Sequence, residues 1–346
     1  VLICGMSNTR SAPTLEDVAS FAGVSTATVS RCLNTPERVF EGTRIKVLEA
    51  VETLGYAPNF AARVMAAKRS NTIGAIIPTM ENAIFARGLQ AFQEELYTEG
   101  YTLIVASSAY QPEIEKEQIR TLVSRGADGL LLIGEDRDPS LYTFLENQNV
   151  PSLVAWTFDE NGARASVGFD NRKSMRELCE EVLRHGHRKI AVISGISDGN
   201  DRARHRLEGI ADALRGAELD PEALRVIETN YGIESGAQAF ETLMREAERP
   251  TAVICGNDVL GVGALGRAHA MGVDVPGQVS ITGFDDIELA KVATPSLTTV
   301  HVPHRKMGRK AARALVEMVE KQSVITPIEL TTSLKLRGSL GPVPSG

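Results

Sequence analysis

The sequence predicts a small all-α head followed by a two-lobed α/β body, in which helices flank two parallel sheets. Residues 14–54 are dense in short helical signals, whereas from Ile73 onward short apolar runs alternate with amphipathic segments. This alternation is typical of parallel sheets with right-handed crossovers. About 270 residues of it exceed what one compact sheet domain commonly needs, so two similar lobes are expected.

Two short helices joined by a tight turn are predicted at the start of the head. Thr14 followed by Asp17 has the pattern of a capping box that opens a first helix over 15–22. A turn at residues 23–24 leads to a second helix, which ends near Leu33. The apolar residues spaced to form their shared core are Val18, Ala19, Val24, Val29 and Leu33.

A third helix is expected at roughly 41–54, ending at Gly55, because apolar residues recur there at helical spacing. Pro58 then breaks the chain, and Asn59 can cap a fourth, short helix over 60–67. The residues that the third helix is expected to bury are Ile45, Leu48, Val51 and Leu54.

The body contains seven apolar runs that are predicted to be strands, with amphipathic helices between them. The runs lie at 73–78, 101–107, 127–134, 151–156, 189–195, 251–256 and 279–284. The intervening helices include 85–99, 113–125, 173–185 and 202–214.

Charge is distributed unevenly along the chain, whose net charge is −7. Residues 1–70 carry eight lysines and arginines against six acidic residues, whereas the remaining chain carries 29 against 38. An acidic body with a mildly basic head keeps non-specific DNA affinity local to the head.

Several functional classes find no support in the sequence. The cysteines Cys4, Cys32, Cys179 and Cys255 lack the paired spacing of zinc or redox centres, and the last three sit in apolar patterns typical of a core. No Ser-His-Asp, metal-ligand or phosphate-loop pattern is present, so we expect no enzyme, cofactor or metal. The run at 261–266 mimics GxGxxG, but it falls inside an expected helix rather than after a strand.

A cytoplasmic, nucleoid-associated protein without a membrane partner is expected. No apolar run approaches the ~20 residues that span a bilayer. The apolar opening of the sequence is short and has no basic residue ahead of it, unlike a signal peptide. Residues 1–13 are expected to be disordered.

The second helix of the head is predicted to expose a short polar face. Two helices joined by a tight turn fit the helix-turn-helix unit, whose second helix enters the major groove. Hydroxyl groups and one guanidinium suit base edges and phosphates. The residues of this face are Ser25, Thr26, Ala27, Thr28, Ser30 and Arg31. The alternative is a three-helix protein-interaction bundle with a solvated face.

These residues resemble the LacI/GalR family of lactose and galactose repressors. The family signature is matched by TLEDVASFAGVSTATVSRCLN at 14–34, and the similarity extends to about residue 340. Further matching segments are ETLGYAPNFAAR (52–63), VGFDN (167–171), GHRKIAVISG (186–195), RLEGI (206–210), ICGNDVLGVGAL (254–265), VSITGFDD (279–286) and PSLTTVHVP (295–303). The resemblance implies a sequence-specific repressor of transcription with a periplasmic-binding-protein-like body that senses a small molecule.

The resemblance also implies which residues contact DNA. Those facing base edges would be Thr26, Ala27 and Arg31, and those near phosphates would be Thr14, Ser25, Thr28 and Ser30. In the hinge helix, Asn59 and Arg63 would steady the helix against the backbone. Met65 stands where the family commonly has a leucine wedged into the minor groove, and an apolar wedge of this kind bends the duplex. The alternative for Met65 is a loose interdomain contact.

Phe40 departs from the family pattern, which has Ser or Thr as the cap of the third helix. A lost cap costs about 1 kcal/mol. We therefore expect this helix to begin later, near Thr43.

The effector is expected in a cleft between the lobes, where polar groups at strand ends meet. By resemblance, Phe85 and Tyr231 would stack on the ligand and Arg206 would grip its oxygens. The implied effector-binding residues are Phe85, Arg202, Arg206, Tyr231, Asn257 and Asp285, with Trp156 and His304 close to the cleft.

Each of these residues has an ordinary structural alternative. Residues 285–286 could form a turn after a strand, Asn257 could cap the following helix, and Arg206 could lie on a solvated helix face. His185 and His187 flank a glycine and are expected in a solvated turn rather than at a metal.

The effector is expected to be a sugar or a sugar acid. Arg202, Arg204, His205 and Arg206 form a cationic cluster, and paired arginines suit carboxylate or phosphate. The segments AYQPEIEKEQ (109–118), VGFDN and PHRKMG (303–308) resemble the gluconate-responsive branch of the family.

The expected domains are a DNA-binding domain at 14–57, a hinge helix and linker at 58–70, and an effector-binding and dimerisation domain at 71–346. Lobe 1 would comprise about 71–170 and 301–330, and lobe 2 about 171–300 and 331–343, with a last strand at 332–339 returning to lobe 2.

The expected partners are a pseudo-palindromic double-stranded DNA operator, a small-molecule effector and a second copy of the chain. No leucine heptad follows Arg337, so a homodimer is expected rather than a tetramer. The main alternative is a solute-binding receptor of the periplasmic type, which the DNA-binding head disfavours. A sugar kinase or dehydrogenase is disfavoured by the missing phosphate loop.

Overall fold

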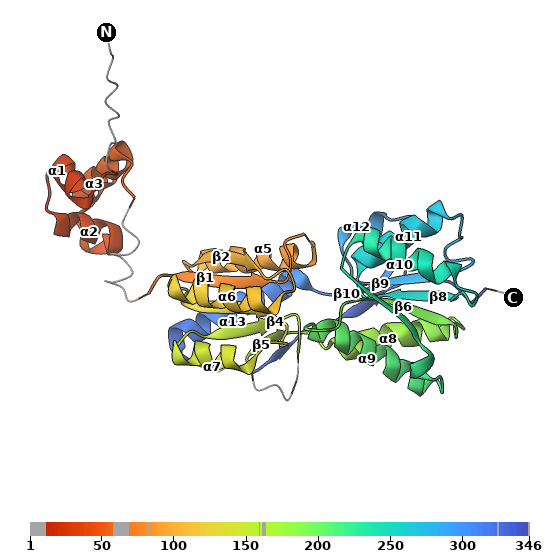
Figure 1. Ribbon diagram of the computed structural model, residues 1–346. Helices are drawn as coiled ribbons and strands as arrows, with labels where there is room; N and C mark the ends of the chain where they lie inside the picture. Colours follow the sequence, from red (N-terminus) through yellow and green to blue (C-terminus); the bar gives the residue numbers. More distant parts are fainter. Residues whose placement is uncertain are drawn as a thin grey trace, which may run out of the picture. The chain divides into compact units, whose positions relative to one another are not determined.

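The computed structural model describes residues 12–57, 69–81, 83–158, 160, 164–323 and 325–344. Internal contacts divide the chain into two units, Val1–Ser70 and Asn71–Gly346, which are described separately below as the head and the body (Figure 1). The predicted fourth helix at 60–67 lies outside the described residues, as does most of the expected disordered segment. Within the described ranges, no helix is long and apolar enough to cross a membrane.

The described part of the head, residues 12–57 and 69–70, contains three α-helices. They are α1 (Leu15–Ala22), α2 (Thr26–Asn34) and α3 (Glu41–Leu54), with the short 3-10 helix η1 (Pro36–Arg38) before α3. The predicted capping box is confirmed, because the Thr14 hydroxyl accepts a hydrogen bond from the Asp17 N–H while the Asp17 carboxylate accepts one from the Thr14 N–H. Gly23 ends α1 with a φ of 65°, a left-handed conformation that glycine adopts without strain.

The third helix differs from the prediction in its start and in its buried face. It begins at Glu41 rather than near Thr43, although no side chain caps it. The acidic side chain in the first turn suits the positive end of the helix dipole and compensates in part for the missing cap. Ile45 and Leu48 are about half exposed, at 48% and 47%. Val51 and Leu54, also predicted to be buried, do pack against the head's core, whose buried residues are Val18, Ala19, Val29, Cys32, Val47 and Ala50.

The first lobe of the body (lobe 1) is built on a six-stranded parallel sheet in the order β11-β5-β4-β3-β1-β2. Its strands are β1 (Thr72–Ile77), β2 (Thr102–Ser107), β3 (Gly129–Ile133), β4 (Ser152–Ala155), β5 (Ser166–Gly168) and β11 (Ile328–Glu329). Helices α5 and α13 pack on one face and α6 and α7 on the other (Figure 1). These helices are α5 (Ala83–Thr98), α6 (Pro112–Ser124), α7 (Pro139–Asn147) and α13 (His304–Lys321).

The second lobe (lobe 2) has a six-stranded sheet in the order β12-β10-β9-β8-β6-β7, parallel except for β12 against β10. Its strands are β6 (Ile190–Gly195), β7 (Arg225–Thr229), β8 (Ala252–Cys255), β9 (Ser280–Asp285), β10 (Thr298–His301) and β12 (Ser333–Lys335). Helices α8 and α9 cover one face, and α10 and α11 the other. The helices are α8 (Asn171–Arg184), α9 (Asp201–Gly216), η2 (Pro221–Ala223), α10 (Ile233–Arg245), α11 (Asp258–Ala270) and α12 (Glu288–Val292).

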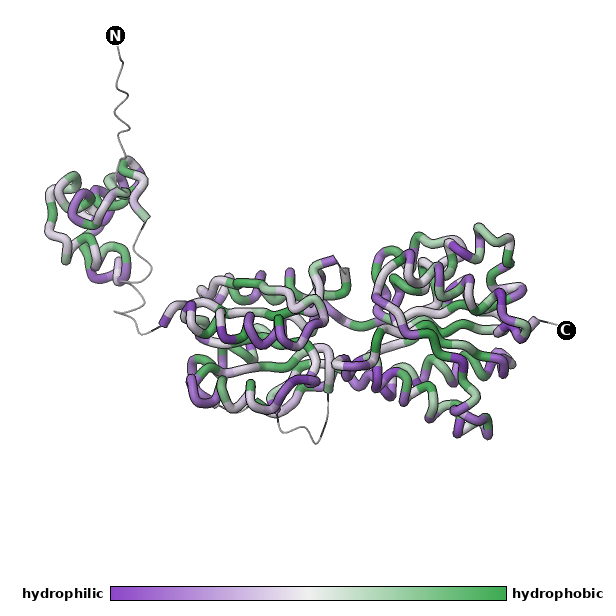
Figure 2. The backbone as a smooth tube through the Cα atoms, viewed as in Figure 1, coloured by the Kyte–Doolittle hydropathy of each residue, from purple (hydrophilic) through white to green (hydrophobic). Residues whose placement is uncertain are grey.

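The predicted fold class is confirmed. All seven predicted strands are present, and Figure 2 shows hydrophobic segments running along the central strands of the body while hydrophilic segments lie mainly on its outer helices. Cys32, Cys179 and Cys255 are buried as predicted, and the 261–266 run lies inside α11.

The prediction of a solvated turn is wrong for His187. Its side chain is buried, with Nδ1 3.0 Å from the Thr251 hydroxyl and Nε2 3.0 Å from the Gly341 carbonyl oxygen. The chain near residue 341, distant in sequence, covers the imidazole, and this contact cannot be read from the local pattern.

Candidate effector cavity and DNA-reading helix

Helix α2 of the head presents a polar face. Ser25, Thr26, Ala27 and Arg31 are exposed, whereas Thr28 and Ser30 are half-buried. Val29 and Cys32 on the opposite face are buried, and they anchor the helix in the bundle. The exposed face therefore stands on a rigid support, which suits a helix that reads base edges.

The polar residues at the two helix starts have local hydrogen bonds. Ser25 caps α2, since its hydroxyl accepts a hydrogen bond from the Thr28 N–H, and the two hydroxyls lie 2.9 Å apart. Thr14 is exposed at the start of α1. Three further predicted DNA-binding residues, Asn59, Arg63 and Met65, lie outside the described residues.

The structure brings seven of the eight predicted effector residues to one cavity between the lobes, which has about 330 Å³ of space not filled by atoms, part of it open to solvent. They are Phe85, Trp156, Arg202, Arg206, Tyr231, Asn257 and Asp285. The cavity is narrow and is lined from both lobes. Asn257 follows β8, Asp285 ends β9, and Arg202 and Arg206 lie on α9. These positions are at the carboxyl ends of parallel strands, where ligands commonly bind. Ten residues line this cavity in all, and it is called the effector cavity below.

Three lining residues of the effector cavity were not among the predicted site residues. They are Ile84, Tyr110 and Asn200. Tyr110 lies in the 109–118 segment, which resembles the gluconate-responsive branch of the family. Asn200 immediately precedes α9 and caps it, so the pattern of a cap before a helix could have indicated its position.

Arg206 is held rigidly in the effector cavity and is buried, which excludes a solvated helix face. Its Nε donates to the Asn171 side-chain oxygen at 2.9 Å and its Nη1 donates to the Gly256 carbonyl at 2.6 Å. The guanidinium carbon lies 3.8 Å from the centroid of the Phe284 ring. A cation stacked on an aromatic ring and bonded on two sides presents its remaining nitrogen in a fixed direction.

That remaining nitrogen faces Asp285. Arg206 Nη2 lies 3.9 Å from Asp285 Oδ1, which is too far for a hydrogen bond. Both carboxylate oxygens of Asp285 are buried without a hydrogen-bond partner in the described part of the chain. Burial raises the pKa of Asp285 to about 7, although the neighbouring Arg206 acts to lower it. The carboxyl group is therefore ready to bond to a ligand.

Asp286, next in the chain, serves the turn instead. Its carboxylate accepts one hydrogen bond from Arg337 at 2.5 Å and lies 2.8 Å from His301 Nδ1. The turn and the ligand contact predicted for residues 285–286 thus fall to different residues. Asp286 stabilises the turn, while Asp285 faces the effector cavity.

Two further buried donors in the cavity have no hydrogen-bond partner within the described ranges. They are Trp156 Nε1 and Asn257 Nδ2. The side-chain oxygen of Asn257 accepts from the Leu260 N–H at 2.9 Å and so caps α11, which leaves its amide nitrogen for another acceptor. An unmade hydrogen bond of this kind costs about 1–3 kcal/mol, and a ligand oxygen would remove that cost.

His304 lies behind the cavity rather than lining it. Its ring is 6.3 Å from that of Trp156, measured between centroids, and its Nε2 is 3.8 Å from Asp285 Oδ1. Burial lowers the pKa of His304 to about 3, so the imidazole is neutral at physiological pH.

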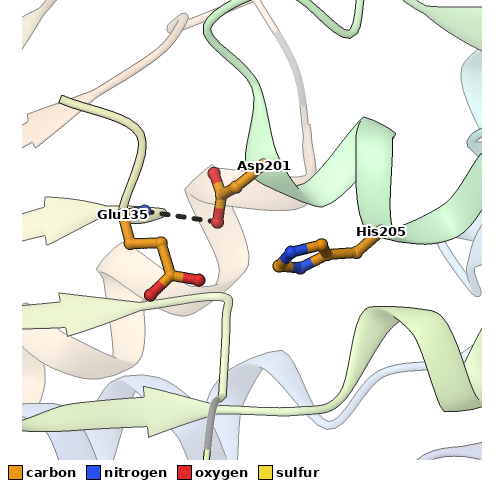
Figure 3. Close-up of side chains that lie close together, drawn as sticks. All are labelled: Glu135, Asp201 and His205. Carbon is orange, nitrogen blue, oxygen red and sulfur yellow. Dashed lines mark hydrogen bonds between the residues drawn. The ribbon is translucent and has the colours of Figure 1, made fainter. Parts of the chain in front are cut away.

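The Arg202–Arg206 cluster predicted from the sequence is only partly correct. Arg202 and Arg206 share one face of α9 and line the cavity, whereas Arg204 turns to Asp136 of lobe 1 and makes hydrogen bonds of 2.6 and 2.7 Å. His205 also lies toward the loop after β3, near Glu135 (Figure 3). The physical reason is the 100° turn per helical residue, which separates positions 202 and 206 from 204.

The loop after β3 and the start of α9 form a contact between the lobes. The Glu135 N–H donates to the Asp201 carboxylate at 3.2 Å (Figure 3). Asp201 also accepts from Arg202 at 2.8 Å. Burial acts to raise the pKa of Asp201, but Arg202 and the Glu135 N–H lower it below its ordinary value. The contact is therefore an ionised network.

The same residues have the composition of a metal-ligand group. One potential ligand atom from each of Glu135, Asp201 and His205 lies within 4.8 Å of the others. Arg202 neutralises Asp201, and Arg204 is paired with Asp136. Both carboxylate oxygens of Asp201 already accept hydrogen bonds, Oδ1 from Arg202 and Oδ2 from the Glu135 N–H, so we interpret the group as an interlobe contact.

The comparisons with known proteins agree with this architecture. The model of bacterial regulatory proteins of the lacI family matches residues 14–59, and that of a periplasmic binding protein-like domain matches residues 179–340. The HTH-type transcriptional repressor PurR of Vibrio atlanticus (strain LGP32) is 33% identical over 308 residues, which cover 89% of this chain and 92% of that protein.

Solved structures of similar proteins cover nearly the whole chain. A LacI-family regulator from Silicibacter pomeroyi has a TM-score of 0.87 at 27% identity and covers 95% of this chain and 99% of its own. The lac repressor dimer bound to operator and the anti-inducer ONPF has a TM-score of 0.83 at 28% identity, covering 96% and 100%. The regulator CelR in complex with cellobiose has a TM-score of 0.70 at 29% identity, covering 94% and 99%.

A helix-turn-helix head followed by a two-lobed, cavity-bearing body defines a DNA-binding transcription regulator that responds to a small molecule. The chain belongs to the LacI family of bacterial regulatory proteins. It is a regulator and not an enzyme, as the sequence predicts.

Proposed function

We propose that a sugar acid in the effector cavity controls the affinity of this regulator for its operator. The observation that carries the proposal is the set of buried, unpartnered polar atoms in one cavity, two donors (Trp156 Nε1 and Asn257 Nδ2) and one carboxyl group (Asp285). Buried polar atoms are normally hydrogen-bonded, so their convergence supports a polar ligand.

The arrangement of these atoms favours a polyhydroxylated ligand. Trp156 and Asn257 would donate to ligand oxygens, while the Asp285 carboxyl group would bond to a ligand hydroxyl group. Phe85 and Trp156, with ring centroids 5.5 Å apart, supply an apolar wall for the carbon skeleton. Few oriented polar groups on an apolar wall are typical of small-molecule sites.

The charges favour an acid over a neutral sugar. Asp285 has a pKa of about 7, so at neutral pH it balances only part of the charge on Arg206. Arg202 adds a second guanidinium at the wall of the cavity. Because Arg202 is paired with Asp201, the unbalanced charge is that of Arg206, and a ligand carboxylate would complete its balance, since guanidinium and carboxylate match in geometry.

Calorimetric titration of the full chain with gluconate and with glucose tests this proposal. We expect gluconate to bind and Arg202→Leu to weaken it by at least about tenfold. The matched control is Arg215→Leu, which removes an exposed arginine from the end of the same helix. Binding of glucose alone, or equal effects of the two variants, would contradict an anionic effector.

For the DNA-binding head, we propose that Thr26, Ala27 and Arg31 face base edges and that the half-buried and capping hydroxyls lie near phosphates. The exposure of the first three supports this assignment. The residues proposed near phosphates are Thr14, Ser25, Thr28 and Ser30. We further propose that Asn59, Arg63 and Met65 act in a hinge that enters the minor groove.

We propose the domain division stated above, with a DNA-binding domain at 14–57, a connecting hinge at 58–70 and lobes that exchange chain near residues 170, 301 and 331. The division of contacts after Ser70 and the strand membership of the two sheets support it. The similar lac repressor is a dimer on its operator, and we propose the same assembly here, on a pseudo-palindromic site and in the cytoplasm.

In this assembly, effector binding would shift the balance between arrangements of the two lobes and so alter the paired hinges. A gel-shift with a palindromic operator library, with and without gluconate, tests the coupling. We expect a sequence-selective shift whose midpoint moves with gluconate. The absence of any selective shift in both conditions would instead favour a solute-binding receptor.

A further inference from the structure

We propose that Tyr110 and Tyr231 form an aromatic gate that limits the effector to one sugar unit. This inference rests on the proposed effector cavity. Tyr110 lies in the loop between β2 and α6 of lobe 1, and Tyr231 lies before α10 of lobe 2. Their ring centroids are 5.9 Å apart and the rings are tilted by 40°, a distance at which aromatic rings attract each other. The pair therefore joins the two lobes through a side-chain contact that the sequence did not predict.

The two rings stand between two spaces. The effector cavity shares Tyr110, Asn200 and Tyr231 with an outer cleft of about 1400 Å³. The other residues of the outer cleft are Thr79, Met80, Glu81, Ser107, Ala109, Ile196, Asp198, Thr229 and Asn230. The two tyrosine rings line both spaces. A ligand that moves from the outer cleft into the effector cavity therefore passes beside these rings.

The backbone holds Tyr110 in an unusual conformation. Ala109 and Tyr110 have φ values of 51° and 57°, and two consecutive non-glycine residues in the left-handed region are uncommon. The turn is closed by a hydrogen bond from the Gln111 N–H to the Ser108 carbonyl at 2.9 Å. Strain of this kind persists where the surroundings over-determine it and is frequent at ligand clamps. Here it directs the ring toward Tyr231.

Tyr231 is fixed from behind. Gly195, at the end of β6, leaves room for the ring, and a methyl group on Gly195 would collide with it. The Tyr231 ring therefore rests on the backbone of the central sheet of lobe 2. Tyr110 is 39% exposed, so Tyr110 is the movable half of the gate and Tyr231 is the stop.

The position of the gate sets the length of the effector. The polar atoms that await a partner lie inside the effector cavity, at Trp156, Asn257 and Asp285. A ligand that reaches them and carries a second sugar would have to extend past the rings into the outer cleft. The contact between Tyr110 and Tyr231 blocks that path, so the effector is a single-sugar acid rather than a disaccharide acid.

Quenching of tryptophan fluorescence tests the gate without any effector. Trp156 is the single tryptophan of the chain, is 2% exposed and lines the effector cavity. We expect acrylamide to quench Tyr110→Ala several-fold faster than the unaltered protein, whereas Tyr110→Phe, which keeps the ring, stays unchanged. Tyr97→Ala removes an exposed tyrosine of lobe 1 and is the matched control. Equal quenching of Tyr110→Ala and the unaltered protein, or an equal rise in Tyr97→Ala, would overturn the gate.

Calorimetry with gluconate and with lactobionate, an acid of two sugar units, tests the length limit. We expect the unaltered protein to bind gluconate at least about tenfold more tightly than lactobionate, and Tyr110→Ala to lose most of this difference. Equal affinities in the unaltered protein would overturn the length limit. If neither acid binds while the quenching pattern holds, the gate stands and the assignment of a sugar acid fails.

Discussion

Arg204 of lobe 2 and Asp136 of lobe 1 are joined by two parallel hydrogen bonds of 2.6 and 2.7 Å. The loop that carries Asp136 is rigid, because the buried Arg137 donates to the carbonyls of Gly134 and Ile133 and pairs with Glu115 at 3.0 Å. A salt bridge on a rigid loop loses little side-chain entropy when it forms. This pair therefore stabilises the arrangement in which the two lobes touch.

Removing this pair should weaken effector binding. We expect Asp136→Ala to reduce the affinity for gluconate by about two- to fivefold, because a partly exposed pair contributes at most about 1 kcal/mol to the contact. Isothermal calorimetry measures the change.

The matched control is Asp212→Ala. Asp212 makes the same two-bonded contact with Arg172, at 2.6 and 3.0 Å, but both residues belong to lobe 2. This variant should lose similar stability and keep its affinity for gluconate. Equal losses of affinity in both variants would show that the Arg204–Asp136 pair has no special part in joining the lobes.

Arg31 provides a prediction for the head. It is the one residue of the proposed reading face with a guanidinium, which is suited to guanine. Arg31→Ala should cost about 1–3 kcal/mol of operator binding and relax base preference at a single position. Lys46→Ala, which removes an exposed cation from α3, should leave the preference unchanged. Selection from a randomised operator library measures it, and an unaltered preference at every position for Arg31→Ala would contradict the assignment.

Much of the fold could be predicted because its central strands are continuous apolar runs. Strands β1, β3, β6, β8 and β9 are buried along their whole length. The short β5 and the mixed polar β7 were missed, because three residues or an alternating exposure give no clear period. The exposed Ile45 shows the same limit, since apolar spacing alone did not fix which face of α3 meets the bundle.

The site could be predicted only where family resemblance and geometry coincide. Seven of the proposed effector residues meet in one cavity because they lie at or just after strand ends, on one face of α9 or, for Phe85, in the first turn of α5. Arg204 was grouped with Arg206 by proximity in sequence, yet its partner Asp136 lies 68 positions away. Tyr110 was missed because a left-handed backbone, which directs its ring, leaves no signature in a non-glycine residue.

The pKa of Asp285 predicts a pH dependence of effector binding. Burial raises this pKa to about 7, so the group is protonated below and charged above that pH. An anionic effector beside Asp285 favours the protonated form, and its binding therefore takes up a proton. Affinity for gluconate should be nearly constant below about pH 6 and should fall by up to about tenfold per unit above pH 7. Titrations between about pH 5.5 and about pH 8.5 measure the slope, because this range extends roughly one pH unit or more to each side of the pKa.

Asp285→Asn is the control for this slope, because an amide cannot ionise. The variant should bind gluconate with an affinity independent of pH in this range. His304 does not contribute, since its pKa of about 3 keeps it neutral throughout. An affinity that rises with pH, or a slope that persists in Asp285→Asn, would show that another group is titrating.

Gly134 offers the sharpest test of how lobe contact couples to binding. It follows β3 with a φ of 70°, and a methyl group there would collide with the Arg202 guanidinium and the Asp201 carboxylate of the other lobe. Gly134→Ala should therefore separate the lobes at this point and displace Arg202 from the effector cavity. We expect a loss of gluconate affinity of at least about tenfold.

Gly100→Ala separates this effect from backbone strain. Gly100 has a φ of 78°, but a methyl group there meets no atom within 4 Å. Both variants should lose stability by roughly 1–2 kcal/mol, the usual cost of a side chain in the left-handed region, and thermal unfolding would show this common loss. Only Gly134→Ala should lose affinity, because only its methyl group lies between the lobes. If Gly134→Ala binds gluconate as tightly as Gly100→Ala, then the contact between Gly134 and Arg202 is not needed for binding, and the effector must be held with the lobes further apart.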